Sequence, residues 1–330
     1  MKLKVAQFGL GPIGIETLRL AAQKPWLEIV AGIDIDPDKV GKDLGKFCGI
    51  KSLVGRQIYA SINEIPGRMK PDLVFHTTVS KFRQAFSQLE PLAKRGISVV
   101  SSCEELLFPS LAEPRLTQRL KKICQAHGSR IVGTGVNPGF VMDVLPLCLT
   151  SVNRSVSAIH IQRVVDASTR REPLQRKIGS GLPPQTFRNL FNEGKAGHAG
   201  LKESLALIAD ALNWRITNLT ETGRPVVAKK ALRTKFLSVR QGETCGLHQR
   251  AEAKVNGKTA LTLDLKMYLG APDPHDAIQI EGEPPLNVRI QGGVAGDQAT
   301  VAALVNTAKR IHLAKPGLLL MTDLTLPRFA

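Results

Sequence analysis

Apolar runs of four to seven residues alternate with amphipathic stretches through the first 140 residues. Short apolar runs predict β-strands, and apolar positions three and four residues apart predict helices. The predicted strands are Lys2–Phe8, Leu27–Ile33, Asp72–Phe75, Ile97–Ser101 and Arg130–Thr134. The predicted helices lie near residues 14–23, 82–95 and 111–127. This regular alternation is typical of an α/β domain with a doubly wound parallel sheet.

The pattern changes after about residue 141, where extended stretches outnumber helices. One strand is predicted over 158–167 and one amphipathic helix over 201–212. Five further extended stretches follow, at 226–228, 235–240, 249–255, 260–268 and 286–291. They predict a second, α+β domain built on a strand-rich sheet. We expect the late helix at 297–311 to pack back on the first domain, so the predicted domains are 1–140 with 296–330, and 141–295.

A glycine-rich turn, Gly9-Leu10-Gly11-Pro12-Ile13-Gly14, joins the first strand to the first helix. Such glycines let backbone N–H groups approach a pyrophosphate at the helix N-terminus, which indicates a dinucleotide-binding Rossmann unit. Asp34 ends the second strand, 20 residues past Gly14, where a carboxylate reaches the adenosine ribose. A tight turn without a ligand is the alternative reading.

The acid at position 34 favours NAD, because a carboxylate repels the 2′-phosphate of NADP. Lys39 and Lys42 lie close enough in the sequence to weaken this preference, so NADP use stays open.

Polar residues follow the ends of the later strands. The carboxyl ends of parallel strands share one edge of a sheet, so these residues should line the same dinucleotide site. They are His76, Thr77, Thr78, Cys103, Glu104, Glu105, Asn137 and Pro138. Asn137 is placed to bond the nicotinamide carboxamide, and an ordinary turn is its alternative reading. Cys103 is expected to be a small buried residue with no redox role.

Composition excludes several classes of protein. The chain has 45 Lys and Arg against 28 Asp and Glu, a net charge of +17. The excess of basic residues is spread evenly over residues 1–140 and 141–330 and is not concentrated in one segment. With aromatic residues at only 5%, a nucleic-acid partner is not expected, and the charge favours an anionic ligand. No apolar run approaches the roughly 18 residues of a membrane span. Five scattered cysteines argue against disulfides or a metal site and fit a cytoplasmic protein.

Several local signatures together resemble the family of 2,4-diaminopentanoate dehydrogenases and native amine dehydrogenases, relatives of dihydrodipicolinate reductase. They are Gly9–Gly14, Ser102–Leu106, Gly133–Gly139, Val165–Ala167, Arg170–Arg171, Gly197–Leu201 with Glu203-Ser204, Gly296–Thr300 and Pro316–Leu318. The resemblance spans almost the whole chain. It implies a Rossmann domain and a second domain for substrate binding and homodimer formation. It also implies NAD(P)-dependent oxidative deamination of a small amine, or reductive amination of an aldehyde or ketone with ammonia.

The resemblance also implies residue roles. The Cys-Glu-Glu motif supplies the catalytic glutamate, and we favour Glu104 over Glu105 as the acid–base group. His198 corresponds to a residue of the substrate pocket, although a loop histidine that caps its own helix is an alternative. Phe140 is interpreted as a wall of this pocket. Arg163, like Arg170 and Arg171, has the fork geometry to hold a substrate carboxylate, and salt bridges are the alternative for the latter two.

Two other functions stay open. A dihydrodipicolinate-reductase-like enzyme would reduce a cyclic imine, but its His-His and Lys constellation is not found in this sequence. A non-catalytic dinucleotide sensor would keep the fold without turnover, and the paired acids at a strand end argue against it.

Overall fold

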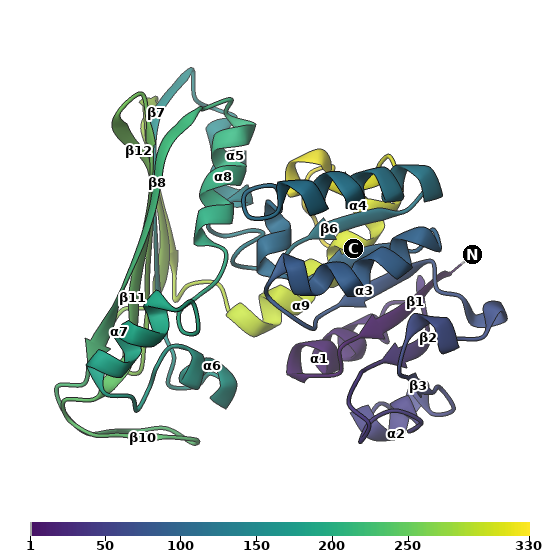
Figure 1. Ribbon diagram of the computed structural model, residues 1–330. Coiled ribbons are helices and arrows are strands. Elements are labelled where there is room, and N and C mark those ends of the chain that lie inside the picture. The colour runs from purple at the N-terminus through teal and green to yellow at the C-terminus, as the bar shows by residue number, and fades with distance from the viewer. Residues whose placement is uncertain (1) are drawn as a thin grey trace. The chain divides into compact units, whose positions relative to one another are not determined.

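The computed structural model describes residues 2–330 and divides the chain into two compact units. Unit 1 comprises residues 1–140 and 295–330, and unit 2 comprises residues 141–294. Figure 1 labels the helices and several of the strands of both units. Each unit has its own sheet.

Unit 1 is a doubly wound parallel sheet, as the sequence predicted. Its strands are β1 (Leu3–Phe8), β2 (Leu27–Ile33), β3 (Ile58–Tyr59), β4 (Leu73–His76), β5 (Ser98–Ser101), β6 (Arg130–Gly133) and β15 (Gly317–Leu319). Their order is β15-β6-β5-β4-β1-β2-β3, and every neighbouring pair is parallel. The direction of winding reverses between β1 and β4, which makes the outer end of these two strands the expected ligand crevice.

Five α-helices accompany this sheet. They are α1 (Pro12–Ala21), α2 (Leu44–Cys48), α3 (Phe82–Lys94), α4 (Pro114–His127) and α9 (Gly296–Leu313). Short 3-10 turns occur at Lys51–Leu53, Ile62–Glu64, Gly67–Met69, Glu104–Leu107 and Met321–Asp323. Helix α3 packs against α4, and α1 packs against α9.

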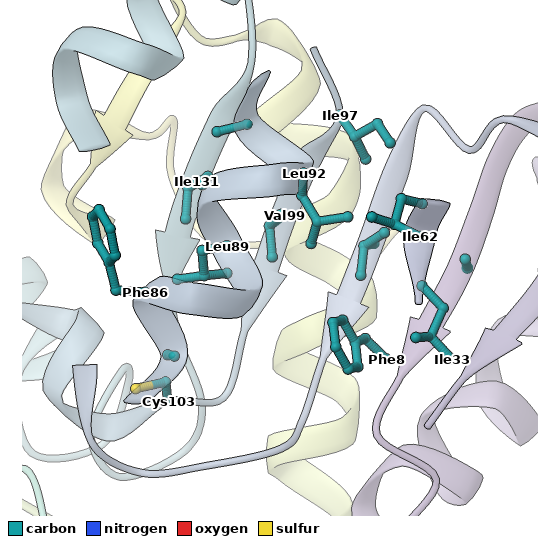
Figure 2. Close-up of a cluster of buried hydrophobic side chains, with 14 of the residues drawn as sticks. Phe8, Ile33, Ile62, Phe86, Leu89, Leu92, Ile97, Val99, Cys103 and Ile131 are labelled. Carbon is teal, nitrogen blue, oxygen red and sulfur yellow. The ribbon is translucent and has the colours of Figure 1, made fainter. Parts of the chain in front are cut away.

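The core beneath α3 follows from helical spacing. Buried positions recur along α3 at Phe82, Phe86, Leu89 and Leu92, and they meet alternate strand residues such as Val99 (Figure 2). Burying each large apolar side chain contributes roughly 1.5–3 kcal/mol. This packing fixes the strand ends that carry the predicted site residues.

Unit 2 contains a six-stranded mixed sheet. Its strands are β7 (Ser155–Asp166), β8 (Ile216–Val227), β11 (Thr244–Val255), β12 (Lys258–Tyr268), β13 (His275–Glu283) and β14 (Leu286–Gln291). The order is β14-β13-β7-β12-β11-β8, with β7 and β12 parallel and the other pairs antiparallel. A small separate hairpin pairs β9 (Leu232–Arg233) with β10 (Ser238–Val239).

Helices cover one face of the sheet of unit 2. They are α5 (Val144–Thr150), α7 (Pro184–Asn192) and α8 (Leu201–Ala211), and α8 packs on β8, β11 and β12. A fourth helix, α6 (Glu172–Lys177), follows β7 along the chain. Along β12, Leu263 and Leu265 are fully buried, whereas Asp264 between them points to the opposite side. We call that opposite side the outer face of unit 2. A hollow of about 450 Å³ lies on it, lined partly by Gln162, Ala277 and Arg289.

Several elements of unit 2 differ from the sequence prediction. Strand β13 and helices α5, α6 and α7 were not predicted, and the stretch predicted at 226–228 is the end of the much longer β8. The strand predicted over 235–240 shrinks to the two residues of β10. None of the helices within residues 2–330 combines the length and apolar character needed to cross a bilayer. Within the same residues, no group of His, Cys, Asp and Glu side chains gathers in a way that would hold a metal ion.

Candidate active site

The last residues of four neighbouring strands in unit 1 lie in one row. Phe8 pairs with His76, His76 with Ser101, and Ser101 with Gly133. The loops after these residues therefore leave the sheet at a single edge, as the sequence predicted. That edge carries the glycine turn, Thr77 and Thr78, the Cys-Glu-Glu segment and the loop of residues 134–140.

The three glycines of the turn lie in different surroundings. Gly9 has φ +91°, and an added Cβ would lie 2.7 Å from the carbonyl oxygen of Thr77. A Cβ on Gly14 would lie 1.9 Å from the carbonyl oxygen of Gly9. Gly11 has φ −80°, which any residue adopts, and its added Cβ would meet nothing within 4 Å. Packing therefore explains Gly9 and Gly14, but the open space above Gly11 fits a ligand.

This open space lies at the N-terminus of α1, where Gly11 is the N-cap and Pro12 and Ile13 form the first turn. Backbone N–H groups and the positive end of the helix dipole favour an anion there. The residues present thus fit the pyrophosphate of a dinucleotide.

Gln7 joins the two loops at the point where the winding reverses. Its side chain is fully buried, and its Nε2 donates to Thr77 Oγ1 (2.8 Å) and to the carbonyl of Gly9 (3.1 Å). Thr77 Oγ1 donates to the same carbonyl over 3.0 Å. The sequence analysis missed Gln7, although a glutamine inside an apolar strand was the available signal.

Asp34 at the end of β2 is bonded to the glycine turn. Its Oδ2 accepts the N–H of Leu10 over 2.7 Å, and its Oδ1 accepts the N–H of Asp36 over 3.1 Å. Lys39 Nζ lies 3.1 Å from Oδ2. Burial alone would raise the pKa of Asp34, but these hydrogen bonds and the ion pair outweigh it and hold the pKa below its usual range. The carboxylate is therefore ionised at neutral pH.

The ring of His76 faces the interior rather than the edge. It is fully buried, with Nδ1 2.8 Å from Ser101 Oγ and Nε2 2.7 Å from Gln88 Oε1 and 2.9 Å from Thr78 Oγ1. Burial lowers the pKa of His76 to about 4, so the ring is neutral near pH 7. We therefore revise the cofactor-binding role predicted for His76: its ring supports two strand ends, and its backbone alone belongs to the edge.

The consecutive acids after β5 have different surroundings. Glu105 Oε2 accepts the N–H of Phe82, the first residue of α3, over 2.8 Å, and its Oε1 pairs with Lys81 at 2.8 Å. Glu105 thus caps α3 and complements its dipole. Glu104, the first residue of the 3-10 turn, is half-buried at the strand edge.

Cys103 is almost fully buried, and its thiol donates to the carbonyl of Ser80 over 3.2 Å. Burial raises the pKa of this thiol, which disfavours a reactive thiolate. Its backbone N–H donates to Ser101 Oγ, so Cys103 fixes the start of the segment that carries Glu104.

The loop after β6 turns tightly. Gly139 has φ +124°, and an added Cβ would lie 2.2 Å from the backbone nitrogen of Gly135. Within the turn Pro138 is buried and Asn137 is half-buried, and Phe140 after it is also half-buried.

His198 in unit 2 is held through its backbone. Gln249 Oε1 accepts the N–H of His198 over 2.8 Å, and Gln249 Nε2 donates to the carbonyl of His198 (2.8 Å) and to Glu221 Oε1 (2.6 Å). Gln249 is only 2% exposed, so this clamp is enclosed. The sequence analysis missed it, and the signal was a glutamine at an inward position of a strand.

Arg163 is an interior residue of the sheet in unit 2. Its Nη1 donates to both carboxylate oxygens of Asp276 (2.6 and 2.7 Å), and its Nη2 donates to the carbonyl of Val294 (2.6 Å). The side chain is 3% exposed. Removing either partner would leave an uncompensated charge in the interior, which destabilises the fold. The ion pair therefore has a structural role. We therefore correct the substrate-binding role predicted for Arg163.

Comparisons with known proteins agree on one family. The model of the 2,4-diaminopentanoate dehydrogenase C-terminal domain matches residues 140–330. The 2,4-diaminopentanoate dehydrogenase of Acetoanaerobium sticklandii is 28% identical over 338 residues, which cover 99% of this chain and 94% of that protein. An amine dehydrogenase of Streptomyces virginiae is 24% identical, over 97% of this chain and 95% of that protein.

The structure of an amine dehydrogenase from Mycobacterium smegmatis has the same fold. The two superpose with a TM-score of 0.89 at 20% identity, over 100% of this chain and 98% of the other.

Proposed function

Because the chain belongs to the 2,4-diaminopentanoate dehydrogenase family, we infer that it is an NAD(P)-dependent oxidoreductase acting on amines. It deaminates a small amine, of the 2,4-diaminopentanoate or simple aliphatic kind, and in reverse aminates an aldehyde or ketone with ammonia. The observation that carries this proposal is the match to 2,4-diaminopentanoate dehydrogenase over 99% of the chain.

The carboxyl edge of the unit 1 sheet is the proposed cofactor site. When bound, NAD(P) supplies the hydride acceptor or donor at C4 of its nicotinamide. In this proposal the N–H groups around Gly11 bind the pyrophosphate, and Asp34 accepts a ribose hydroxyl. The remaining proposed contacts along the edge are Gly9, Pro12, Ile13, Gly14, the backbone of His76, Thr77, Thr78, Cys103, Asn137 and Pro138.

Glu104 is the proposed acid–base residue. In deamination its carboxylate takes a proton from the substrate ammonium, and the free amine then loses hydride from its carbon to give an iminium. Glu104 then releases this proton to solvent, so that its carboxylate can accept a proton from the water that attacks this carbon. That proton passes to the nitrogen, and ammonia leaves as the new hydroxyl loses its proton and the carbonyl forms. The negative charge of Glu104 also stabilises the iminium cation. In the reverse direction the protonated Glu104 assists the loss of water when ammonia adds to the carbonyl.

Phe140 and His198 are each proposed as substrate-binding residues. Phe140 offers an apolar surface, and the imidazole of His198 is able to donate or accept a hydrogen bond. The Gln249 clamp supports this proposal, because it fixes the backbone position of His198.

We further propose a cytoplasmic homodimer that assembles through the outer face of unit 2. The five cysteines, all within the described residues, are free thiols, as expected in a reducing compartment. The outer face is polar rather than apolar, so the contact between subunits would rest on hydrogen bonds and ion pairs.

The direct test of the function is a substrate screen. Oxidation of NADH and NADPH is followed with ammonia and a panel of aldehydes and ketones, beside reduction of NAD and NADP with 2,4-diaminopentanoate. Turnover that needs both ammonia and the carbonyl, or the diamine alone, supports the proposal. Cofactor binding without turnover on any amine or carbonyl would instead identify a dinucleotide sensor.

A further inference from the structure

Lys39 occupies a specific position beside the ribose-binding end of β2. Its Nζ lies 3.1 Å from Asp34 Oδ2 and 3.4 Å from Asp36 Oδ2. The side chain is 22% exposed, so it is partly enclosed but still reaches solvent. Burial alone would lower the pKa of Lys39, but the two carboxylates outweigh it and raise the pKa, so the ammonium is charged.

This ion pair changes the electrostatics of the site. An isolated carboxylate at the end of β2 would repel the 2′-phosphate of NADP. Here Asp34 is already bonded to Leu10, Asp36 and Lys39, so part of its charge is compensated within the protein. Its Oδ2 is also fixed to the glycine turn through Leu10, which keeps Asp34 and Lys39 next to the place where the adenosine ribose is expected.

The ammonium keeps donor capacity for a ligand. It has three N–H donors, and Asp34 and Asp36 each take one. A phosphate monoester carries about two negative charges at pH 7 and accepts strong charge-assisted hydrogen bonds. A lysine in this position therefore suits a 2′-phosphate as well as a carboxylate.

We propose that Lys39 is a cofactor-selectivity residue that allows this chain to bind NADP as well as NAD. With NAD, Lys39 stays on Asp34, which accepts a ribose hydroxyl. With NADP, the ammonium bonds the 2′-phosphate and offsets the repulsion from Asp34 and Asp36. The inference rests on the proposed dinucleotide-binding function.

The experiment compares dissociation constants of NADH and NADPH, measured by fluorescence titration of the full chain without substrate. The variants are Lys39→Met and Lys39→Gln, with Lys42→Met as the matched control, because Lys42 is an exposed lysine three residues away. Melting curves establish that each variant is folded.

We expect wild type to bind NADPH within about tenfold of NADH. Loss of one charge-assisted bond should raise the NADPH Kd of both Lys39 variants by roughly tenfold or more. The NADH Kd should change less than about threefold, and Lys42→Met should leave the ratio unchanged. Added salt should weaken NADPH binding more in wild type than in Lys39→Met.

Equal shifts of both dissociation constants in the Lys39 variants, or no shift for NADPH, would overturn the inference. Such a result leaves the proposed function intact if NADH still binds and amines still turn over. A wild-type chain that binds neither dinucleotide would overturn the proposed function and this inference together. NADH binding without amine turnover would reject only the proposed enzyme activity. The role of Lys39 could still be tested, because the ratio of the NADPH and NADH dissociation constants remains measurable.

Discussion

Glu104 and Glu105 are adjacent residues of one type, and we propose different tasks for them. Glu105 is committed to the first N–H of α3 and to Lys81, both through hydrogen bonds of 2.8 Å. Glu104 begins the turn that follows β5 at the carboxyl edge.

Replacing each acid with glutamine tests this division. Glu104→Gln removes the proton acceptor and the negative charge, so the rate of reductive amination should fall by about 100-fold or more. The NADH Kd should stay within about threefold of wild type, because the proposed cofactor contacts are elsewhere. Steady-state rates and fluorescence titrations give both values.

The matched control is Glu105→Gln, which keeps an acceptor for the N–H of Phe82 but loses the ion pair. Its rate should fall much less, with a modest decrease in melting temperature. Near-normal turnover in Glu104→Gln with an inactive Glu105→Gln would reverse the assignment.

His76 should make stability depend on pH. Its pKa in the folded state is lowered to about 4 from 6.5 by burial. Below pH 6.5 the unfolded chain therefore takes up a proton that the folded chain refuses, so the free energy of unfolding should decrease as pH falls toward 4. The full effect is about 3 kcal/mol.

Urea denaturation at several pH values between 7 and 4 measures this contribution as a difference between wild type and His76→Gln. The variant should lose stability less steeply over this range. Parallel curves for the two proteins would mean that His76 does not titrate as its burial implies.

Among the elements, the turn between β1 and α1 is where substitutions should best distinguish effects on stability from effects on ligand binding. A Cβ added to Gly14 would lie 1.9 Å from the carbonyl oxygen of Gly9, whereas a Cβ added to Gly11 would meet nothing within 4 Å. Gly11→Ala should leave the melting temperature nearly unchanged, because φ −80° suits alanine. It should raise the NADH Kd by about tenfold or more, because the methyl group occupies space proposed for the pyrophosphate.

Gly14→Ala is the contrasting variant and should destabilise unit 1, since the backbone must move. Calorimetry and NADH titration distinguish the two effects. Wild-type NADH affinity in a folded Gly11→Ala protein would contradict the proposed location of the pyrophosphate.

Most elements of unit 1 could be predicted, because each buries one clear apolar pattern. Helix α2 and strands β3 and β15 were not predicted, since they have only two to five residues. Strand β8 escaped full prediction because its residues are mostly half-buried or exposed, and threonines and charged residues interrupt the apolar alternation. Helices α5, α6 and α7 have only six to nine residues, too few to display a helical period.

Positions along the carboxyl edge of unit 1 were predictable wherever a polar residue or a turn follows a strand end. Glu104, Asp34 and the glycine turn are examples. The Gln249 clamp was not, because it joins residues 51 positions apart and depends on how β11 meets the loop of His198. The ion pair of Arg163 with Asp276 spans 113 positions and was missed for the same reason.

At the scale of the whole molecule, the outer face of unit 2 is the surface through which we propose that two chains associate. Ala277 lies at the hollow of that face, paired in register with Gln162 on one side and Arg289 on the other. If two chains associate there, Ala277→Arg should weaken the dimer, because it adds a cation next to Arg289 in both subunits.

Light scattering over a range of concentrations should give twice the chain mass of 35.8 kDa for wild type and a lower mass for Ala277→Arg. Thr259→Arg, at an exposed position near the start of β12, should behave as wild type. A concentration-independent monomer in wild type would reject the homodimer.

The central claim is that the protein passes hydride between the nicotinamide and a carbon that bears nitrogen. Its most direct test uses NADH deuterated at both C4 positions, ¹⁵N-labelled ammonia and the carbonyl compound that reacts fastest in the screen. Mass spectrometry and NMR of the product locate both labels. The account predicts an amine in which one carbon carries both deuterium and ¹⁵N. A deuterated alcohol, or an amine without deuterium on the carbon bonded to nitrogen, would contradict it.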